Sequence, residues 1–236
     1  MNAEAVSEFD TALCGQGLDA RHLPSPAGSF PMWLVDAGRS NAEAIEHLLS
    51  GEEMAAANRF RLRALRRRYI VAHGALRILF RDRYGVPSGE QDIGRNRFGK
   101  PHLIRFPGLQ YSLSYSGDFV MIGVGEGDPI GVDIEVHRVI DDAAALMDIY
   151  FTAAERSAVL RRASPGTCSR EFLEIWVRKE ACVKACGCGL GIPLKDVECG
   201  VSGDQMTTVQ FGGSRYRTGA LRLGDPIMAW SRRTSL

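Results

Sequence analysis

The spacing of apolar residues along this chain changes from one segment to the next. Between residues 62 and 79 they recur three and four positions apart, at Leu62, Leu65, Tyr69, Ala72, Leu76 and Leu79. This period predicts an amphipathic helix with one buried stripe. Tyr84-Gly85, followed by Pro87, predicts where that helix ends. A second long helix is expected from Arg170 to Ala185, stopping in the glycine-rich stretch 187–191.

Shorter segments between these helices have the patterns of strands. We expect strands over 32–36, 102–105, 111–114, 119–125 and 130–135, separated by turn residues. Asn41 is a candidate cap for a helix that continues to Leu49, and Asp141 or Asp142 begins another helical stretch. Thr152 and Glu155 have the spacing of a capping box that opens a further short helix.

Each half of the chain therefore predicts helices followed by strands. A length of 236 residues is enough for one large domain or for two small ones that share a core. We expect an α+β fold made of two similar α/β subdomains, residues 1–126 and 127–236, in one compact unit.

Composition narrows the classes of function. Apolar residues make up 45% of the chain, charged residues 24%, and the formal net charge is +1, so no global attraction to a polyanion is expected. No apolar run approaches the roughly 20 residues that span a bilayer. The acidic start lacks the pattern of a secretory signal. We expect a cytoplasmic protein that binds neither a membrane nor nucleic acid.

Three of the six cysteines are close together, at Cys182, Cys186 and Cys188. Their spacing matches no zinc pattern, because there is no Cys-x-x-Cys pair and no histidine nearby. We expect free thiols in a reducing compartment.

Two acids lie two positions apart in the strand expected at 130–135. Alternate residues of a strand face the same side, about 6.5–7 Å apart, so Asp133 and Glu135 share a face while Val132 and Ile134 point into the core. Two such carboxylates can bind one hard cation, and Mg²⁺ prefers oxygen ligands. The alternative is an exposed strand edge with its acids in water.

The second long helix carries further charged groups. Trp176, Glu180 and Lys184 are four residues apart and share one helix face. Glu180 can supply a third carboxylate, and Lys179 and Lys184 can meet phosphate oxygens. The alternative is a solvated Glu180–Lys184 pair, worth about 0.3–0.5 kcal/mol.

An arginine-rich segment precedes and begins the first long helix. Its planar donors suit phosphate, although a solvated helix face and RNA binding are alternatives. The arginines are Arg59, Arg61, Arg63, Arg66, Arg67 and Arg68. The glycine-rich stretch 187–191 is no phosphate-binding P-loop, since no Gly-Lys-Ser/Thr follows and no strand precedes it. A Gly-x-Ser-x-Gly hydrolase motif is also missing from the sequence.

The order of these segments resembles that of the Sfp-type 4′-phosphopantetheinyl transferases, over about residues 59–194. The likeness lies in Phe98-Gly99-Lys100-Pro101-His102, Tyr111-Ser112-Leu113-Ser114-Tyr115-Ser116-Gly117, Gly131-Val132-Asp133-Ile134-Glu135, Phe151-Thr152 with Glu155, and residues 176–190. Each motif alone is weak, and their shared order carries the resemblance.

The resemblance implies a reaction and a set of ligands. The 4′-phosphopantetheine arm of coenzyme A would pass to a serine of an apo acyl or peptidyl carrier protein, leaving adenosine 3′,5′-bisphosphate. A carrier- or coenzyme-binding module without catalysis is the alternative. The family likeness also implies a subdomain pair related by pseudo-twofold symmetry, with the cofactor site at its interface, in a monomer.

The same resemblance implies roles for individual residues. Asp133, Glu135 and Glu180 would hold Mg²⁺. Glu180, directly or through a water, would take the serine proton, with Lys179 and Lys184 as further catalytic groups. Coenzyme contacts are expected from Arg61, Arg68, Lys100, Pro101, His102, Ser114, Tyr115, Asp133, Lys179 and Lys184.

One position departs from the family pattern. Tyr115 stands where the family usually has a histidine expected to touch a coenzyme phosphate. Tyrosine can donate one hydrogen bond but carries no positive charge near pH 7. That departure puts this phosphate contact in doubt.

Overall fold

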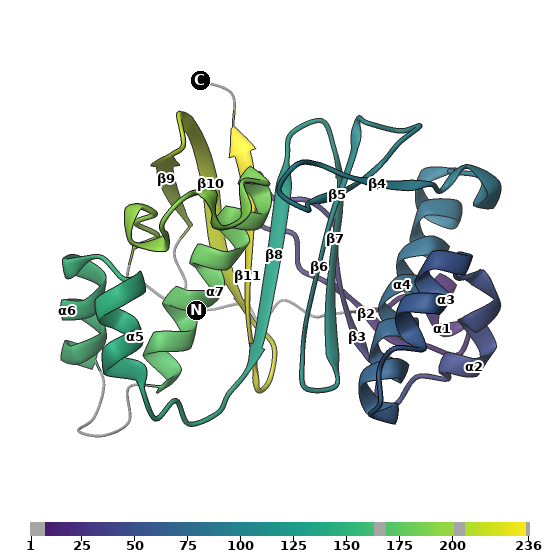
Figure 1. The fold of residues 1–236 in the computed structure, drawn as a ribbon, viewed down its shortest axis with the longest axis horizontal. Helices are drawn as coiled ribbons and strands as arrows, with labels where there is room; N and C mark the ends of the chain where they lie inside the picture. The colour runs from purple at the N-terminus through teal and green to yellow at the C-terminus, as the bar shows by residue number, and fades with distance from the viewer. Residues whose placement is uncertain (1–7, 163–168, 201–205, 235–236) are drawn as a thin grey trace.

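The computed structural model describes residues 8–162, 169–200 and 206–234. These residues form a mixed helix-and-sheet fold with two larger antiparallel sheets and one hairpin (Figure 1). The first sheet has the order β1 (Glu8–Phe9), β2 (Asp19–Leu23), β3 (Met32–Asp36), β7 (Phe119–Glu126) and β6 (Leu109–Ser116). The second has the order β8 (Ile130–Val136), β11 (Pro226–Thr234), β10 (Ser214–Arg222) and β9 (Thr207–Phe211), and the hairpin pairs β4 (Ile93–Arg95) with β5 (Pro101–Leu103).

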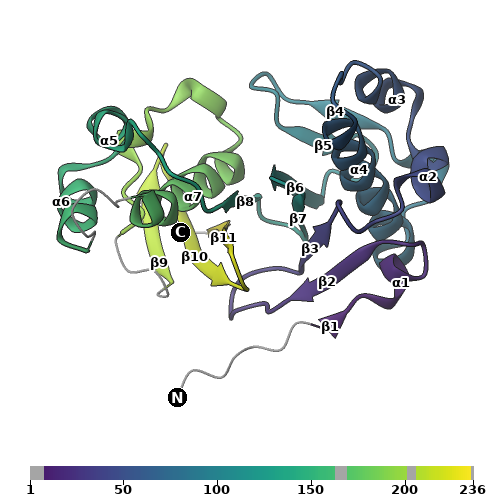
Figure 2. The same cartoon turned by 90° about the horizontal axis from the view of Figure 1, so that it is seen from below.

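Helices cover the outer flanks of the two sheets. Figure 1 shows α1 (Thr11–Cys14), α2 (Ala42–Ile45), α3 (Gly51–Ala57) and α4 (Arg63–Tyr84) on one flank. The opposite flank holds α5 (Ala143–Tyr150), α6 (Ala153–Arg162) and α7 (Ser169–Cys186). Single 3₁₀ turns lie at Glu46–Leu48, Ser88–Glu90, Gly189–Gly191 and Leu194–Asp196. Figure 2 shows β6 and β8 in the space between α4 and α7.

The predicted helix that begins near residue 62 is confirmed as α4. Its apolar stripe is buried against the first sheet, with Leu76 at 1% and Leu79 at 0% exposed. Gly85 ends the helix at φ 65°, a left-handed conformation that glycine adopts without a steric penalty. Leu62 departs from the prediction: it lies just before the first turn and is 65% exposed.

The predicted helix 170–185 is confirmed as α7, which packs across β8 and β11. Gly131 allows this close approach, because a β-carbon there would overlap the backbone of Ala181 and Ala185. The helix therefore lies directly over β8, and its residues face the acids of that strand.

Serine side chains join the two sheets where β6 runs beside β8. Ser112 Oγ accepts from Val132 N at 3.0 Å, and Ser116 Oγ accepts from Val136 N at 3.1 Å. A shared apolar cluster lies between the sheets and includes Met32, Val132 and Trp230. Residues from both halves of the chain thus share one core, while the predicted subdomain boundary and the pseudo-twofold relation stay predictions.

Several local expectations needed correction. The helix capped by Asn41 is shorter than predicted, since α2 ends at Ile45 and a 3₁₀ turn follows. The strand predicted over 102–105 is displaced to Pro101–Leu103. The expectation of free thiols is wrong for Cys186 and Cys188, which are joined in a disulfide. No helix among the described residues is long and apolar enough to cross a membrane.

Candidate active site

A cavity of about 700 Å³ lies between the two halves of the chain. Strands β6 and β8, helix α7 and the β4–β5 hairpin contribute its walls. Trp176, Glu180 and Lys184 all line it, as their four-residue spacing on one helix face predicted. Asp133 and Glu135 line it from β8. Val132 is buried in the core as predicted, and Ile134 is buried there too but also borders the cavity.

Three polar groups meet at the centre of this cavity. Lys184 Nζ lies 2.7 Å from Asp133 Oδ1 and donates to Ser114 Oγ at 2.9 Å. The Ser114 hydroxyl in turn donates to Asp133 Oδ1 at 2.7 Å. The triangle joins residues from both halves of the chain, since Ser114 lies on β6 and Asp133 on β8.

The other two acids of the predicted site differ in their surroundings. Glu135 accepts from Ser116 Oγ at 2.7 Å and from Arg138 Nη1 at 2.5 Å. Glu180 makes no hydrogen bond or ion pair with the residues that the structure describes. Its carboxylate lines the cavity and is free to meet a ligand.

Burial and like charge disfavour ionised acids in this cavity. Burial raises the pKa of the Asp133 carboxyl above its usual range, although Lys184 and Ser114 oppose the shift. Burial, together with the negative charges of Asp133 and Glu135, raises the pKa of Glu180. Bringing a positive charge between these acids would relieve that repulsion.

The donor set has the chemistry of a hard-cation site. Three carboxylates from Asp133, Glu135 and Glu180 offer oxygen ligands, which Mg²⁺ prefers. As they stand, Asp133 and Glu135 are paired with Lys184 and Arg138. Within the described ranges, no three His, Cys, Asp or Glu side chains are arranged as a ligand group. The donors fit the cation by chemical type, and binding it would require these ion pairs to rearrange.

Lys179 lies away from the cavity, in the interior beneath α7. Its side chain is 0% exposed, and its Nζ pairs with Glu155 Oε2 at 2.7 Å. It also donates to Leu194 O at 2.8 Å and Val197 O at 2.6 Å. Glu155 forms the predicted capping box with Thr152 as well. This placement differs from the predicted contact of Lys179 with the coenzyme, because its ammonium is already bound by Glu155 and two backbone carbonyl groups.

The Gly-Lys-Pro segment reaches the cavity through two of its predicted residues. Lys100 and Pro101 line it, while the exposed His102 does not. Lys100 Nζ donates to Ile130 O at 3.1 Å and Ala185 O at 3.0 Å. Burial, with some repulsion from Arg233, lowers the pKa of Lys100 to about 8. The lysine thus ties the hairpin to the opposite half of the chain.

Of the arginines expected to contact the coenzyme, Arg68 lies beside the cavity and Arg61 is exposed ahead of α4. Arg68 stacks over the ring of Tyr115, with the guanidinium carbon 4.8 Å from the ring centroid, and donates to Gly117 O at 2.7 Å. Tyr115 lines the cavity and is 43% exposed. The aromatic ring therefore brings the arginine charge next to the cavity wall.

Sequence reasoning missed Asn96, which joins the hairpin tip to the end of α7. Its Oδ1 accepts from Phe98 N and Lys100 N, each at 2.9 Å. Its Nδ2 donates to Gly187 O at 2.8 Å, across 91 positions of sequence. An Asn followed by Gly99 and Lys100 predicts a turn, but the contact with Gly187 depends on the tertiary fold.

Comparisons with known proteins show which family this sequence resembles. The sequence model of the 4′-phosphopantetheinyl transferase superfamily matches residues 129–225, which include Asp133, Glu180 and Lys184. The 4′-phosphopantetheinyl transferase HetI of Nostoc sp. is 30% identical over 184 residues, or 76% of this chain and 77% of the relative. The 4′-phosphopantetheinyl transferase psf-1 of Bacillus pumilus is 29% identical over 173 residues, or 73% and 72%. A 4′-phosphopantetheinyl transferase of Bacillus subtilis is 26% identical over 165 residues, or 69% and 71%.

Proposed function

This chain belongs to the 4′-phosphopantetheinyl transferase superfamily and is an enzyme of that class, and on this premise we propose the reaction that its cavity performs. The 4′-phosphopantetheine arm of coenzyme A passes to a serine hydroxyl of an acyl or peptidyl carrier protein. Adenosine 3′,5′-bisphosphate leaves. The observation that carries the proposal is the contact of Lys184 with Asp133 and Ser114 in a cavity that Glu180 also lines.

Glu180 is the proposed acceptor of the serine proton, directly or through one water. Its carboxylate lines the cavity and has no competing partner among the described residues, which leaves it open to the serine hydroxyl. As the proton leaves, the serine oxygen bonds to phosphorus. The bond from phosphorus to the bridging oxygen of the pyrophosphate breaks, and the bisphosphate departs with that oxygen and its electron pair.

Lys184 is the proposed source of positive charge at the reacting phosphate. Its side chain is 31% exposed and lines the cavity from α7. Charge that builds on phosphate oxygens in the transition state is stabilised by such a fixed cation. Ser114, whose hydroxyl already touches Lys184, would orient the lysine and donate to a phosphate oxygen.

Asp133, Glu135 and Glu180 are the proposed ligands of Mg²⁺. When bound, the metal would supply Lewis-acid stabilisation of charge on the pyrophosphate oxygens. Burial is the main cause of the raised pKa values of Asp133 and Glu180, and repulsion between the acids adds to it, so a cation bound among them would relieve that repulsion. Arg68 and Lys100, which lie at the cavity edge, are the proposed electrostatic partners of the coenzyme phosphates. We propose that the enzyme acts as a cytoplasmic monomer.

A panel of apo-carriers from fatty-acid, polyketide and nonribosomal-peptide pathways tests the reaction. Each carrier is incubated with the enzyme, coenzyme A and Mg²⁺, and its intact mass is measured with and without EDTA. We expect at least one carrier to gain the phosphopantetheine arm in Mg²⁺ and none to gain it in EDTA. Coenzyme binding without any mass gain would favour a non-catalytic binding module, and RNA binding with no gain would favour the basic-helix alternative.

A further inference from the structure

A histidine with no part in the proposed transfer lines the wall of the cavity. His73 lies in the middle of α4 and lines both the main cavity and a second hollow of about 890 Å³, which lies between α3, α4 and the β4–β5 hairpin. Arg95 lines both hollows too. An imidazole and a guanidinium therefore border the junction of the two hollows.

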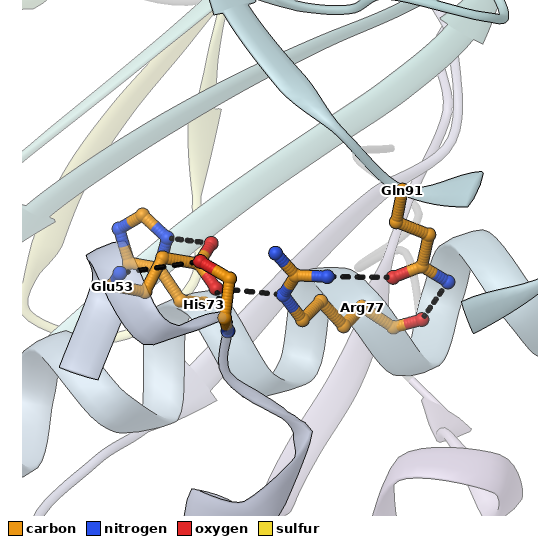
Figure 3. A network of polar contacts seen from close by, with 5 residues as sticks. Glu53, His73, Arg77 and Gln91 are labelled. Carbon is orange, nitrogen blue, oxygen red and sulfur yellow. Dashed lines mark hydrogen bonds and ion pairs between the residues drawn. The ribbon is translucent and has the colours of Figure 1, made fainter. Parts of the chain in front are cut away.

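Glu53 contacts the ring of His73 and holds it in place (Figure 3). The carboxylate belongs to the capping box of α3, where Ser50 N donates to Glu53 Oε2 at 2.8 Å. Arg77 Nε donates to the same oxygen at 2.7 Å. Gln91 supports Arg77 by accepting from its guanidinium at 3.4 Å and donating to its carbonyl at 3.2 Å. These contacts fix the carboxylate before any ligand arrives.

The charge of Glu53 determines which nitrogen of His73 carries a proton. Burial opposes ionisation, but hydrogen bonds from His73, Arg77 and the Ser50 backbone lower the pKa of Glu53 to about 2. An ionised carboxylate can only accept, so the hydrogen between Glu53 Oε1 and His73 Nδ1, which are 3.0 Å apart, belongs to the imidazole. The other ring nitrogen, Nε2, is left for a further partner.

The plane of the imidazole is fixed as well. Tyr69 stacks on His73 with ring centroids 4.1 Å apart and an interplanar angle of 25°. The His73 side chain is 15% exposed, so most of its surface is already covered by protein. Within the described residues, Nε2 makes no hydrogen bond. His73 thus has a fixed orientation, and the cationic side chain of Arg95 lines the same two hollows.

We propose that His73 binds a phosphate of coenzyme A at the junction of the two hollows, with Glu53 as its positioning residue. In the doubly protonated ring Nε2 is a second donor, and the charge-assisted bond to a phosphate oxygen is of the strong class. Arg95 adds a second cation at the same junction. The proposal rests on the proposed function, because that function supplies the phosphorylated ligand. Both the 3′-phosphate and the pyrophosphate have the required chemistry.

Matched substitutions separate a ligand contact from a structural role. His73→Asn keeps an amide that can donate to Glu53 but removes the distal nitrogen. His73→Gln places an amide near the position of Nε2 and gives up the contact with Glu53. His47→Asn makes the same change at an exposed histidine outside the cavity. Binding of coenzyme A and of 3′-dephospho-coenzyme A is measured by calorimetry without a carrier, and thermal unfolding checks the fold of each variant.

We expect His73→Asn to weaken coenzyme A binding about tenfold, the range for loss of one hydrogen bond to a charged group. His73→Gln should recover part of the affinity, and His47→Asn should bind as the wild type does. A loss with coenzyme A alone assigns His73 to the 3′-phosphate, and an equal loss with both ligands assigns it to the pyrophosphate. A folded His73→Asn variant with wild-type affinity for coenzyme A would overturn the proposal.

The carrier-loading assay keeps this result apart from the proposed function. If the wild type loads carriers while His73→Asn binds coenzyme A normally, the inference about His73 fails alone. If His73→Asn loses coenzyme A but the wild type loads no carrier, the transfer reaction fails and the binding role of His73 stands.

Discussion

The ammonium of Lys184 and the carboxylate of Asp133 lie 2.7 Å apart, on elements that Gly131 allows to approach closely. Both groups also hydrogen-bond to the hydroxyl of Ser114, so α7, β8 and β6 meet at one point. The lysine that is proposed to stabilise the reacting phosphate is therefore held by a proposed metal ligand until a substrate and a cation arrive.

Replacing this lysine should damage catalysis more than the fold. Lys184→Met removes a fixed cation from the cavity, and we expect kcat for carrier loading to fall about a hundredfold or more. The melting temperature should also fall, because Asp133 is left buried without its ion pair. Lys195→Met, at an exposed lysine, is the control and should match the wild type. Turnover of Lys184→Met within a few-fold of wild type would remove Lys184 from the mechanism.

Substitution of the proposed base should have opposite effects on activity and stability. The folded-state pKa of Glu180 is raised, so this acid contributes stability below its unfolded pKa of about 4.3 and loses it as pH rises through the folded value. Glutamine does not ionise, so Glu180→Gln keeps this stability as the pH rises. In EDTA, we expect the variant to melt above the wild type at pH 8 and the difference to shrink toward pH 4, while turnover is lost.

A parallel titration with Mg²⁺ checks whether Glu180 helps to bind the cation. Mg²⁺ should raise the melting temperature of the wild type and have less effect on Glu180→Gln, because one proposed ligand is gone. Glu198→Gln, at an exposed acid, controls for the loss of one negative charge. Unchanged turnover of Glu180→Gln would show that another group takes the serine proton.

The buried pair of Lys179 and Glu155 should matter for stability. Lys179→Met leaves the Glu155 charge unpaired in the interior, and we expect a loss of about 3–5 kcal/mol in the free energy of unfolding, measured in urea. The double variant Lys179→Met/Glu155→Gln should lose less than the two single changes summed. Coenzyme affinity of the folded protein should stay as in the wild type. A stable Lys179→Met variant that has lost coenzyme binding would instead support the direct contact expected from sequence.

Tyr115 tests the position where the chain departs from its family. We expect Tyr115→His to keep or improve coenzyme A binding, because an imidazole adds a group that can carry positive charge beside Arg68. Tyr115→Phe keeps the ring under the Arg68 guanidinium and is the matched control. Coenzyme affinity by calorimetry and loading rates measure both variants. A large loss of activity in Tyr115→His alone would show that the tyrosine has its own role.

Periodicity predicted the elements of the site well. The four-residue spacing of Trp176, Glu180 and Lys184 and the alternation around Asp133 are local patterns, and local geometry determines which face each side chain shares. Partners across the fold were harder to predict. Lys179 is adjacent to Glu180 in sequence, yet a step of one residue around a helix turns its side chain into the core.

Contacts between segments far apart in the sequence could not be predicted from local patterns. Asn96 reaches Gly187, and Glu53 reaches His73, only because the fold brings separate elements together. Neither pair has a spacing that any secondary structure would explain. The capping box of Ser50 and Glu53 is a local motif with a known sequence pattern. The contact of Glu53 with the imidazole, however, depends on how α3 packs on α4.

The central claim is that this cavity transfers phosphopantetheine to a carrier serine, and mapping the modified residue tests it most directly. Coenzyme A labelled in its pantetheine portion is incubated with Mg²⁺, the enzyme and an apo-carrier, beside a carrier whose acceptor serine is replaced by alanine. We predict that the wild type attaches the label to the serine by a phosphodiester and that Glu180→Gln does not. An enzyme that is folded and binds coenzyme A, yet leaves the serine of every carrier unlabelled, would contradict the account.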